Sequence, residues 1–377
     1  MFASSSPPAA DTLEISLFGT GVGEALAVHV GNGEWILVDS CRQTKASPEP
    51  FNLSYLRSLG VDPTKDVKLI VATHWHDDHV AGLSELVEQC QSASLVFSHA
   101  LANDEFQCIV GLYSTHQVSF DNEKSGVREM GRSLDTLLKR KYATPASYRP
   151  PVRTQADSRI FRRDDCEVIA LSPSPESIQM AMEEMASAWH ALEAEARGGR
   201  GPRPARSGFP CPQRNHNAVA LWVKWGERRI LLGADLEEHG NRLLGWQAVL
   251  SCNQFPDGHA RVFKIPHHGS PNGDYEHIWQ DIVVNDDAYA LLTAYNRGRT
   301  PRPSLDDIER IRQHTNEIYY TSLPRKTANR YDRTVERTIK GIVRRRRGLG
   351  PTPGHIQMRW DAVGNISVEV AGAASKI

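Results

Sequence analysis

The residues with the clearest chemical potential lie in one short segment, His74-Trp75-His76-Asp77-Asp78-His79. The segment directly follows the apolar run VKLIVAT (67–73) and precedes a helical pattern. Imidazoles bind zinc, iron or manganese, and an added carboxylate is typical of a site that keeps one position open for water. The alternative is a polar surface turn, but so many ligand side chains directly after an apolar strand would be an odd coincidence. We therefore predict a metal centre on a strand-to-helix loop.

Two later segments place further ligand types at the ends of apolar strands. Gly233-Ala234-Asp235 closes the strand-like run RRILLGAD (228–235), and His267-His268-Gly269-Ser270 follows ARVFKIP (260–266). A carboxylate after an apolar strand is commonly structural, so Asp235 alone would not indicate a ligand. Its meaning depends on the other two motifs.

Together, HxHxDH, the Gly-Ala-Asp segment and HHGS resemble the metallo-β-lactamase-fold hydrolases. The chain is more narrowly similar to the metallo-β-lactamase-like domain of the ComEC competence DNA-uptake proteins and its stand-alone relatives. That similarity rests on GTGVGEALAVHVGNGEWILVDS (19–40), NHNAVALWVKWGERRILLGADLE (215–237) and KIPHHGSPN (264–272). The resemblance implies an α/β protein, a four-layer αββα sandwich with a metal centre at one edge of its two sheets. It also implies hydrolysis of an ester, amide or phosphodiester.

The resemblance further implies a dinuclear centre when it is carried over residue by residue. The catalytic residues would be Asp78 and His268, and the cofactors two divalent metal ions, zinc or else manganese or iron. Such ions lower the pKa of a bridging water and hold the attacking and leaving oxygens. Asp78 would bind the second cation, and Asp235 would bridge both cations because a carboxylate has two oxygens to share. The metal ligands implied in this way are His74, His76, Asp78, His79, Asp235 and His267.

The roles of four positions stay open. His216 is either a further ligand or a surface histidine. His268 could replace His267 as the ligand, stabilise charge on the substrate or protonate the leaving group. Asp39 either orients the metal loop from behind the ligands or simply ends a strand. Arg302-Pro303 stands where ComEC-like domains often have His-Pro, and the Arg302 guanidinium could hold a phosphate.

The elements that must position these residues alternate along the chain. Apolar runs separated by glycine-rich turns predict strands, and apolar stripes at helical spacing predict helices, which together indicate a layered α/β fold. Two similar strand–helix halves, without a P-loop or dinucleotide fingerprint, favour a pseudo-symmetric two-sheet core. The predicted strands are 13–18, 25–30, 34–39, 67–73, 94–98, 166–173, 217–225, 228–235, 260–266, 288–294 and 317–322, and the main helices 51–59, 81–90, 178–192, 237–250 and 304–313.

The predicted domain organisation has three parts. Residues 1–11 are expected to be a disordered leader, and 12–322 a hydrolase domain with helix and loop insertions at about 99–165 and 176–212. Residues 323–377 are expected to form a basic C-terminal extension that ends in a hairpin.

Composition narrows the class of protein. The chain has 377 residues, is 40% hydrophobic and carries 44 basic against 45 acidic side chains, which excludes fibrous and wholly disordered proteins. The six cysteines are scattered without a CxxC, the first residues lack the features of a secretory signal, and no 18 apolar residues run together. We therefore expect a cytoplasmic protein with reduced thiols and no membrane segment.

The near-neutral sum hides a basic segment at 325–347, with ten Lys or Arg against two acids. It includes Arg344, Arg345, Arg346 and Arg347, which could track nucleic-acid phosphates. Alternatively, the segment is a solvated basic helix or a binding site for an acidic protein partner.

The leading hypothesis is a phosphodiesterase or nuclease that acts on nucleic acid or a nucleotide through metal-activated water. One alternative is a small-molecule hydrolase of the same fold, acting on a cyclic nucleotide, lactone or thioester. The other is a non-catalytic metal-binding subunit of a nucleic-acid-associated complex.

Overall fold

The computed structural model describes residues 2–44, 47–102, 125–164, 166–197, 214–252, 255–284, 287–297, 301–322 and 353–377. These residues form two eight-stranded sheets. The first sheet runs in the order β15 (Ile366–Gly372), β14 (Gly354–Trp360), β1 (Leu13–Gly19), β2 (Glu24–His29), β3 (Trp35–Val38), β4 (Val67–Ala72), β5 (Ser94–Ser98), β6 (Val152–Thr154). The second runs in the order β16 (Ser375–Lys376), β13 (Glu317–Tyr320), β12 (Tyr289–Leu292), β11 (Val262–Lys264), β10 (Arg228–Leu232), β9 (Leu221–Trp225), β8 (Cys166–Ala170), β7 (Ser158–Arg163).

The main core lies between the two sheets. Successive side chains of a strand point to opposite faces, so in β2 Leu26 and Val28 enter this core while Ala25 and Ala27 face outward. Strands of the second sheet meet them with side chains such as Val223. The short apolar runs of the sequence therefore become strands that are buried on both faces.

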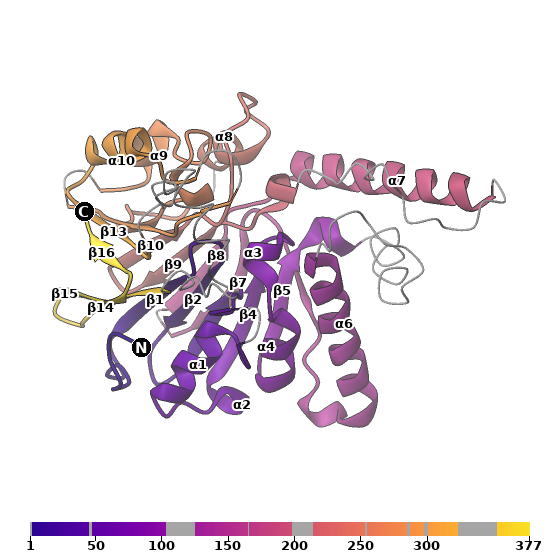
Figure 1. The fold of residues 1–377 in the computed structure, drawn as a ribbon, viewed down its shortest axis with the longest axis horizontal. Coiled ribbons are helices and arrows are strands. Elements are labelled where there is room, and N and C mark those ends of the chain that lie inside the picture. Colours follow the sequence, from indigo (N-terminus) through magenta and orange to yellow (C-terminus); the bar gives the residue numbers. More distant parts are fainter. Residues whose placement is uncertain are drawn as a thin grey trace, which may run out of the picture.

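Helices cover the outer face of each sheet. Figure 1 shows one group of helices on one side of the sandwich and a second group on the other, which makes four layers of the order αββα. The first group packs through residues such as Leu56 and Met130, and the second through Trp246 and Ile311. The helices are α1 (Phe51–Ser58), α2 (Pro63–Asp66), α3 (Asp77–Val80), α4 (Leu83–Gln89), α6 (Ser125–Ala143) and α7 (Pro175–Arg197), then α8 (Gly245–Leu250), α9 (Glu276–Asp281) and α10 (Leu305–Arg312).

Two predicted elements differ from the structure. Residues 99–165 were expected to hold only helices and loops, but β6 and β7 each extend a sheet at its edge. The helix predicted over 237–250 forms only as α8, because Gly240 and Gly245 adopt left-handed backbone with φ of 65° and 53°. The residues before α8 instead form a loop beside the candidate site.

Both ends of the chain belong to the sandwich. The prediction of a disordered leader is corrected by Phe2, whose ring packs edge-on against Phe18, Phe51 and Tyr55. The hairpin of β14 and β15 pairs antiparallel with β1, so the last part of the predicted extension completes the first sheet. The pairing of β16 with β13 adds the final residues to the second sheet.

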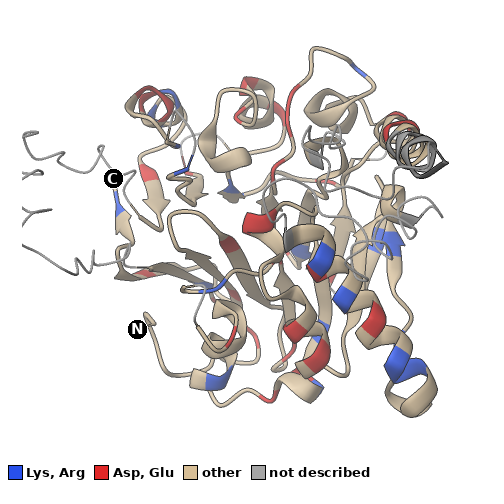
Figure 2. Ribbon diagram, turned by 45° about the vertical axis from the view of Figure 1, so that its right-hand side comes forward, with Lys and Arg blue, Asp and Glu red and all other residues tan. Residues whose placement is uncertain are grey.

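The described surface carries mixed charge. Figure 2 shows blue and red segments side by side on the helices of the first group, and on α6 they form pairs such as Lys139–Asp135, 2.7 Å apart. The predicted nucleic-acid-binding residues Arg344, Arg345, Arg346 and Arg347 lie outside the described residues. None of the described helices is long and apolar enough to cross a membrane.

Candidate metal centre

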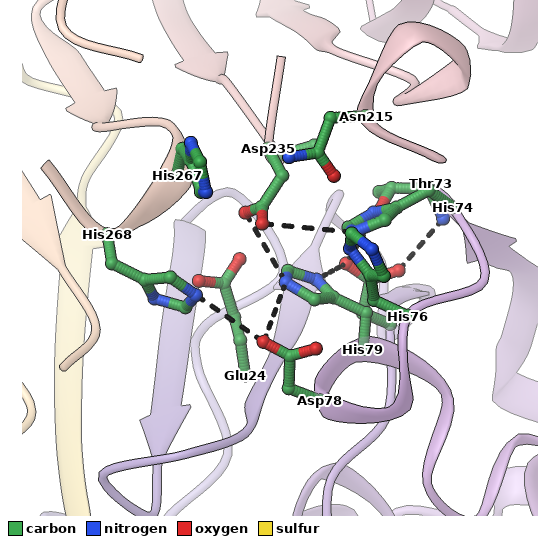
Figure 3. Close-up of polar contacts among 12 residues, drawn as sticks. Glu24, Thr73, His74, His76, Asp78, His79, Asn215, Asp235, His267 and His268 are labelled. Carbon is green, nitrogen blue, oxygen red and sulfur yellow. Dashed lines mark hydrogen bonds and ion pairs between the residues drawn. The ribbon is translucent and has the colours of Figure 1, made fainter. Parts of the chain in front are cut away.

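The metal-ligand types predicted from three separate motifs meet where strands of both sheets end. His74 follows β4, Asp78 and His79 lie on α3, Asp235 follows β10, and His268 lies on the short helix η4 (His267–Gly269) after β11. Figure 3 shows these side chains pointing toward one another. The apolar strands thus bring together residues almost 200 positions apart.

One group of ligand atoms consists of His74, His76 and Asp235, whose nearest ligand atoms all lie within 4.8 Å of one another. His74 Nε2 is 2.9 Å from His76 Nδ1 and 3.8 Å from Asp235 Oδ2. Two imidazole nitrogens and a carboxylate oxygen facing one point form a donor set that suits zinc and similar ions.

A second group consists of Asp78, His79 and His268. His79 Nε2 lies 3.9 Å from Asp78 Oδ2 and 3.3 Å from Asp235 Oδ1, and His268 Nε2 lies 3.5 Å from Asp78 Oδ2. Asp235 thus directs one oxygen toward each group. This is the position that a carboxylate bridging two cations requires.

The position of the proton on the His79 ring shows whether this residue could bind a cation. Its Nδ1 lies 2.7 Å from Asp39 Oδ2, and because a carboxylate only accepts, Nδ1 carries the proton. In the neutral ring, Nε2 then offers a lone pair to the oxygens of Asp78 and Asp235. The buried atoms His79 Nε2 and Asp235 Oδ1 have no hydrogen-bond partner among the described residues. Acceptors that converge without a donor fit a bound metal ion.

The electrostatics of the centre also favour positive charge. Burial alone would lower the pKa of His79, but the carboxylates of Asp235 and Asp39 hold that pKa well above its ordinary value. Burial opposes ionisation of Asp235, yet the imidazoles of His79 and His268 keep its pKa well below the ordinary range. Without a metal ion, the raised pKa places a second proton on His79 Nε2, where it faces the Asp235 carboxylate. A divalent cation could take the place of that proton on the neutral ring.

The backbone around the centre is strained at several points. Asp39, Ala234, His267 and His268 adopt left-handed conformations with φ of 58°, 48°, 46° and 55°. Non-glycine residues seldom adopt this region, and such residues cluster at functional sites because the surrounding structure enforces them. Here the strain occurs next to, or at, the ligand side chains.

Two histidines that the sequence offered as ligands fall outside both groups. His267 was expected to complete the second group, but its Nδ1 lies 2.8 Å from Glu237 Oε1 and His268 takes the place facing Asp78. His216 joins neither group, and its ring packs against His239 with centroids 4.5 Å apart. The two adjacent histidines lie in a tight 3-10 turn and point in different directions. The sequence HHGS alone does not say which of them faces Asp78.

Asp39 lies behind His79, on the side of the ring away from the other candidate ligands. Besides His79 Nδ1, it accepts from Thr73 N and Thr73 Oγ1, both at 2.8 Å. Asp77, the first aspartate of the HxHxDH segment, instead accepts from Gly126 N at 2.8 Å and so anchors the start of α6. Asp39 and Asp77 therefore have different surroundings.

Sequence analysis missed Glu24, a fully buried carboxylate that groups with Asp39 and His79. Its neighbours Lys264 and Thr293 are also fully buried, and both contact it. The only signal was a charged residue inside the apolar run GVGEALAVHV. Arg302, considered for phosphate binding, pairs with Asp307 at 2.6 Å.

Comparisons with known proteins bear on part of the chain. Among solved structures, the chain is similar to a hydrolase called AbOPH in the beta lactamase superfamily, with 12% identity, a TM-score of 0.31, and coverage of 62% of this chain and 74% of that chain. No curated protein sequence matches the chain. Residues 20–104, which include His74, His76, Asp78 and His79, match the model of the metallo-beta-lactamase superfamily, and the two helix-covered sheets are consistent with the metallo-β-lactamase fold.

Proposed function

We propose that this protein is a metallo-β-lactamase-superfamily hydrolase that cleaves phosphodiester bonds, with nucleic acid as its substrate. The observation that carries the proposal is that Asp235 directs one oxygen toward each of two ligand groups. The residues that would hold two divalent ions are His74, His76, Asp78, His79, Asp235 and His268.

Two divalent ions at this place would supply a hydrolytic water of lowered pKa and Lewis-acid stabilisation of the reacting oxygens. The chain's own residues supply the rest. Asp39 keeps the proton of His79 on Nδ1, so that Nε2 faces the centre. Tyr295 stacks on His268, with ring centroids 5.1 Å apart, and fixes the plane of that imidazole. These contacts hold the rings of His79 and His268 in the orientations in which Nε2 faces the centre.

A phosphodiester substrate is supported by two features of the sequence. The similarity to the ComEC metallo-β-lactamase-like domain links the centre to proteins of DNA uptake. The basic segment at 325–347 would neutralise phosphates of a polynucleotide without reading its sequence.

The experiment is a substrate panel with bis(p-nitrophenyl) phosphate, single- and double-stranded DNA, RNA, cyclic nucleotides, a lactone and a thioester. Wild-type protein should lose phosphodiesterase activity in chelator and regain it with Zn²⁺ or Mn²⁺. Asp78→Ala should lower the rate by at least about 100-fold, whereas Asp77→Ala should keep most of it, because Asp77 binds Gly126 rather than facing the centre.

The panel also separates the alternatives. Neutralising Arg344, Arg345, Arg346 and Arg347 should weaken polynucleotide cleavage and reduce its salt dependence, while bis(p-nitrophenyl) phosphate hydrolysis stays unchanged. Activity confined to the cyclic nucleotide, lactone or thioester would identify a small-molecule hydrolase instead. No activity on any phosphodiester by metal-loaded protein would contradict the proposal.

A further inference from the structure

We propose that Glu24 positions two ligands of the metal centre, His268 through Thr293 and Asp235 through Lys264. This inference rests on the metal centre of the proposed function. Glu24 belongs to β2 of the first sheet, whereas its two targets follow strands of the second sheet. One buried carboxylate would therefore align the two halves of the centre.

The contact between Thr293 and His268 fixes which ring nitrogen of His268 carries the proton. His268 Nδ1 lies 3.3 Å from the carbonyl oxygen of Thr293 and 3.0 Å from its hydroxyl oxygen. The carbonyl can only accept, and the single hydroxyl proton of Thr293 is donated to Glu24 Oε2. Both Thr293 oxygens therefore accept from Nδ1–H. The lone pair of His268 is left on Nε2, which faces Asp78.

Glu24 reaches the backbone directly before Asp235 through Lys264, which is fully buried. Lys264 Nζ lies 2.5 Å from Glu24 Oε1 and donates to the carbonyl oxygen of Ala234 at 3.0 Å. Ala234 holds the strained left-handed backbone directly before Asp235. Fixing this carbonyl fixes the peptide from which the bridging carboxylate projects.

The first half of the chain contains a matching arrangement. Thr73 Oγ1 donates to Asp39 Oδ2 and lies 3.0 Å from His74 Nδ1, so that it accepts from this nitrogen. Carboxylate, threonine and histidine therefore follow one another in the same sense at the end of β4 and beyond the end of β12. The repetition of this order in both halves argues that the Glu24 contacts serve the ligand and are no accident of packing.

Stability alone gives a weak reason for the Glu24–Lys264 pair. Removing two charges from water is so unfavourable that buried ion pairs seldom stabilise a fold more than apolar residues of similar size. Instead, Glu24 contacts Thr293, which holds His268, and Lys264 contacts the carbonyl of Ala234, which precedes Asp235. Orientation of these two ligands explains why the pair lies here.

The test compares Thr293→Val, which removes the hydroxyl at nearly constant shape, with Thr293→Ser, which keeps it. Thr154→Val is the matched control, since the buried hydroxyl of Thr154 has no hydrogen-bond partner among the described residues. Each metal-free variant is titrated with Co²⁺, and its affinity and absorption spectrum are recorded together with the thermal unfolding midpoint of the metal-free form.

Thr293→Val should weaken one of two Co²⁺ equivalents by about 10- to 100-fold and alter the spectrum, and Thr293→Ser should restore both. Thr154→Val should bind like wild type. If Thr293→Val binds both equivalents with wild-type affinity and spectrum while His268→Ala loses one, the Glu24 inference fails and the metal centre stands. If His268→Ala also binds two equivalents normally, the proposed centre itself fails.

A measurement on unaltered protein covers the case in which Thr293→Val does not fold. Ring ¹⁵N spectra of metal-free wild type, with the His268 signals assigned from His268→Gln, report where its proton lies. The inference requires the Nδ1–H form of a neutral ring. A dominant Nε2–H form would overturn it.

Discussion

At the scale of single residues, hydrogen bonds on the side away from the centre orient the imidazoles of His74, His79 and His268. His79 is the clearest case, because Asp39 is buried and contacts both His79 and Thr73. Burial raises the pKa of Asp39, although the neighbouring His79 opposes that shift. A carboxylate in this position controls a ligand without facing the centre.

Replacing Asp39 with Asn should therefore impair metal binding while leaving the shape of the site intact. The amide weakens the hydrogen bond that keeps the proton of His79 on Nδ1, and losses of about 10- to 100-fold in metal affinity are typical of such changes. Zinc affinity from competition with a chromophoric chelator measures the effect. Asp77→Asn is the control, and equal affinities of the two variants would contradict this role of Asp39.

The residues of the candidate centre differ in how well the sequence alone could identify them. His74, His76, Asp78 and His79 were predictable, because they are adjacent in one motif after an apolar strand. Glu24 was not, since its contact with Thr293 joins positions 269 residues apart. The choice of His268 over His267 depends on two unusual backbone conformations, which no local pattern of residue types specifies.

At the scale of elements, α10 shows how a surface helix is fixed near the site. Ser304 and Asp307 form a reciprocal capping box, and Asp307 also pairs with Arg302 and Arg310. Burial opposes ionisation of Asp307, but hydrogen bonds from Ser304 and Arg302 hold its pKa below the ordinary value. The capping interaction was predictable from the Ser-x-x-Asp spacing, whereas the engagement of Arg302 was not.

The lowered pKa of Asp307 gives stability with a defined pH dependence. The contribution is fully present above the unfolded pKa of about 3.8, and it is lost as pH falls through the still lower folded value. Asp307→Asn should therefore destabilise the protein at pH 7 and lose less stability than wild type between about pH 5 and pH 2. Urea unfolding at several pH values measures the difference. A constant difference across this range would contradict the assignment.

Strands were predicted best where apolar side chains alternate or run together. β1 and β9 follow such patterns, whereas β7, with the sequence SRIFRR, is rich in arginine and only partly buried. Its conformation comes from pairing with β8 at the sheet edge. Tertiary pairing of this kind is absent from a local sequence pattern.

At the scale of the whole molecule, the two sheets form one sandwich whose strand ends create the centre. The first half supplies His74, His76, Asp78 and His79, and the second supplies Asp235 and His268. Glu24 and Lys264 join the halves beneath these ligands. Strands from the chain's last residues close both sheets, so the predicted two-sheet core includes more of the chain than its motifs indicated.

The most direct test of the central claim, that both halves together hold two metal ions, is the metal stoichiometry of the purified chain. Protein stripped with chelator, reloaded with Zn²⁺ and desalted should retain two equivalents by elemental analysis. His267→Ala should also retain two, because His267 faces Glu237, whereas His268→Ala should retain about one. Retention of one equivalent or less by the wild-type chain would contradict this claim.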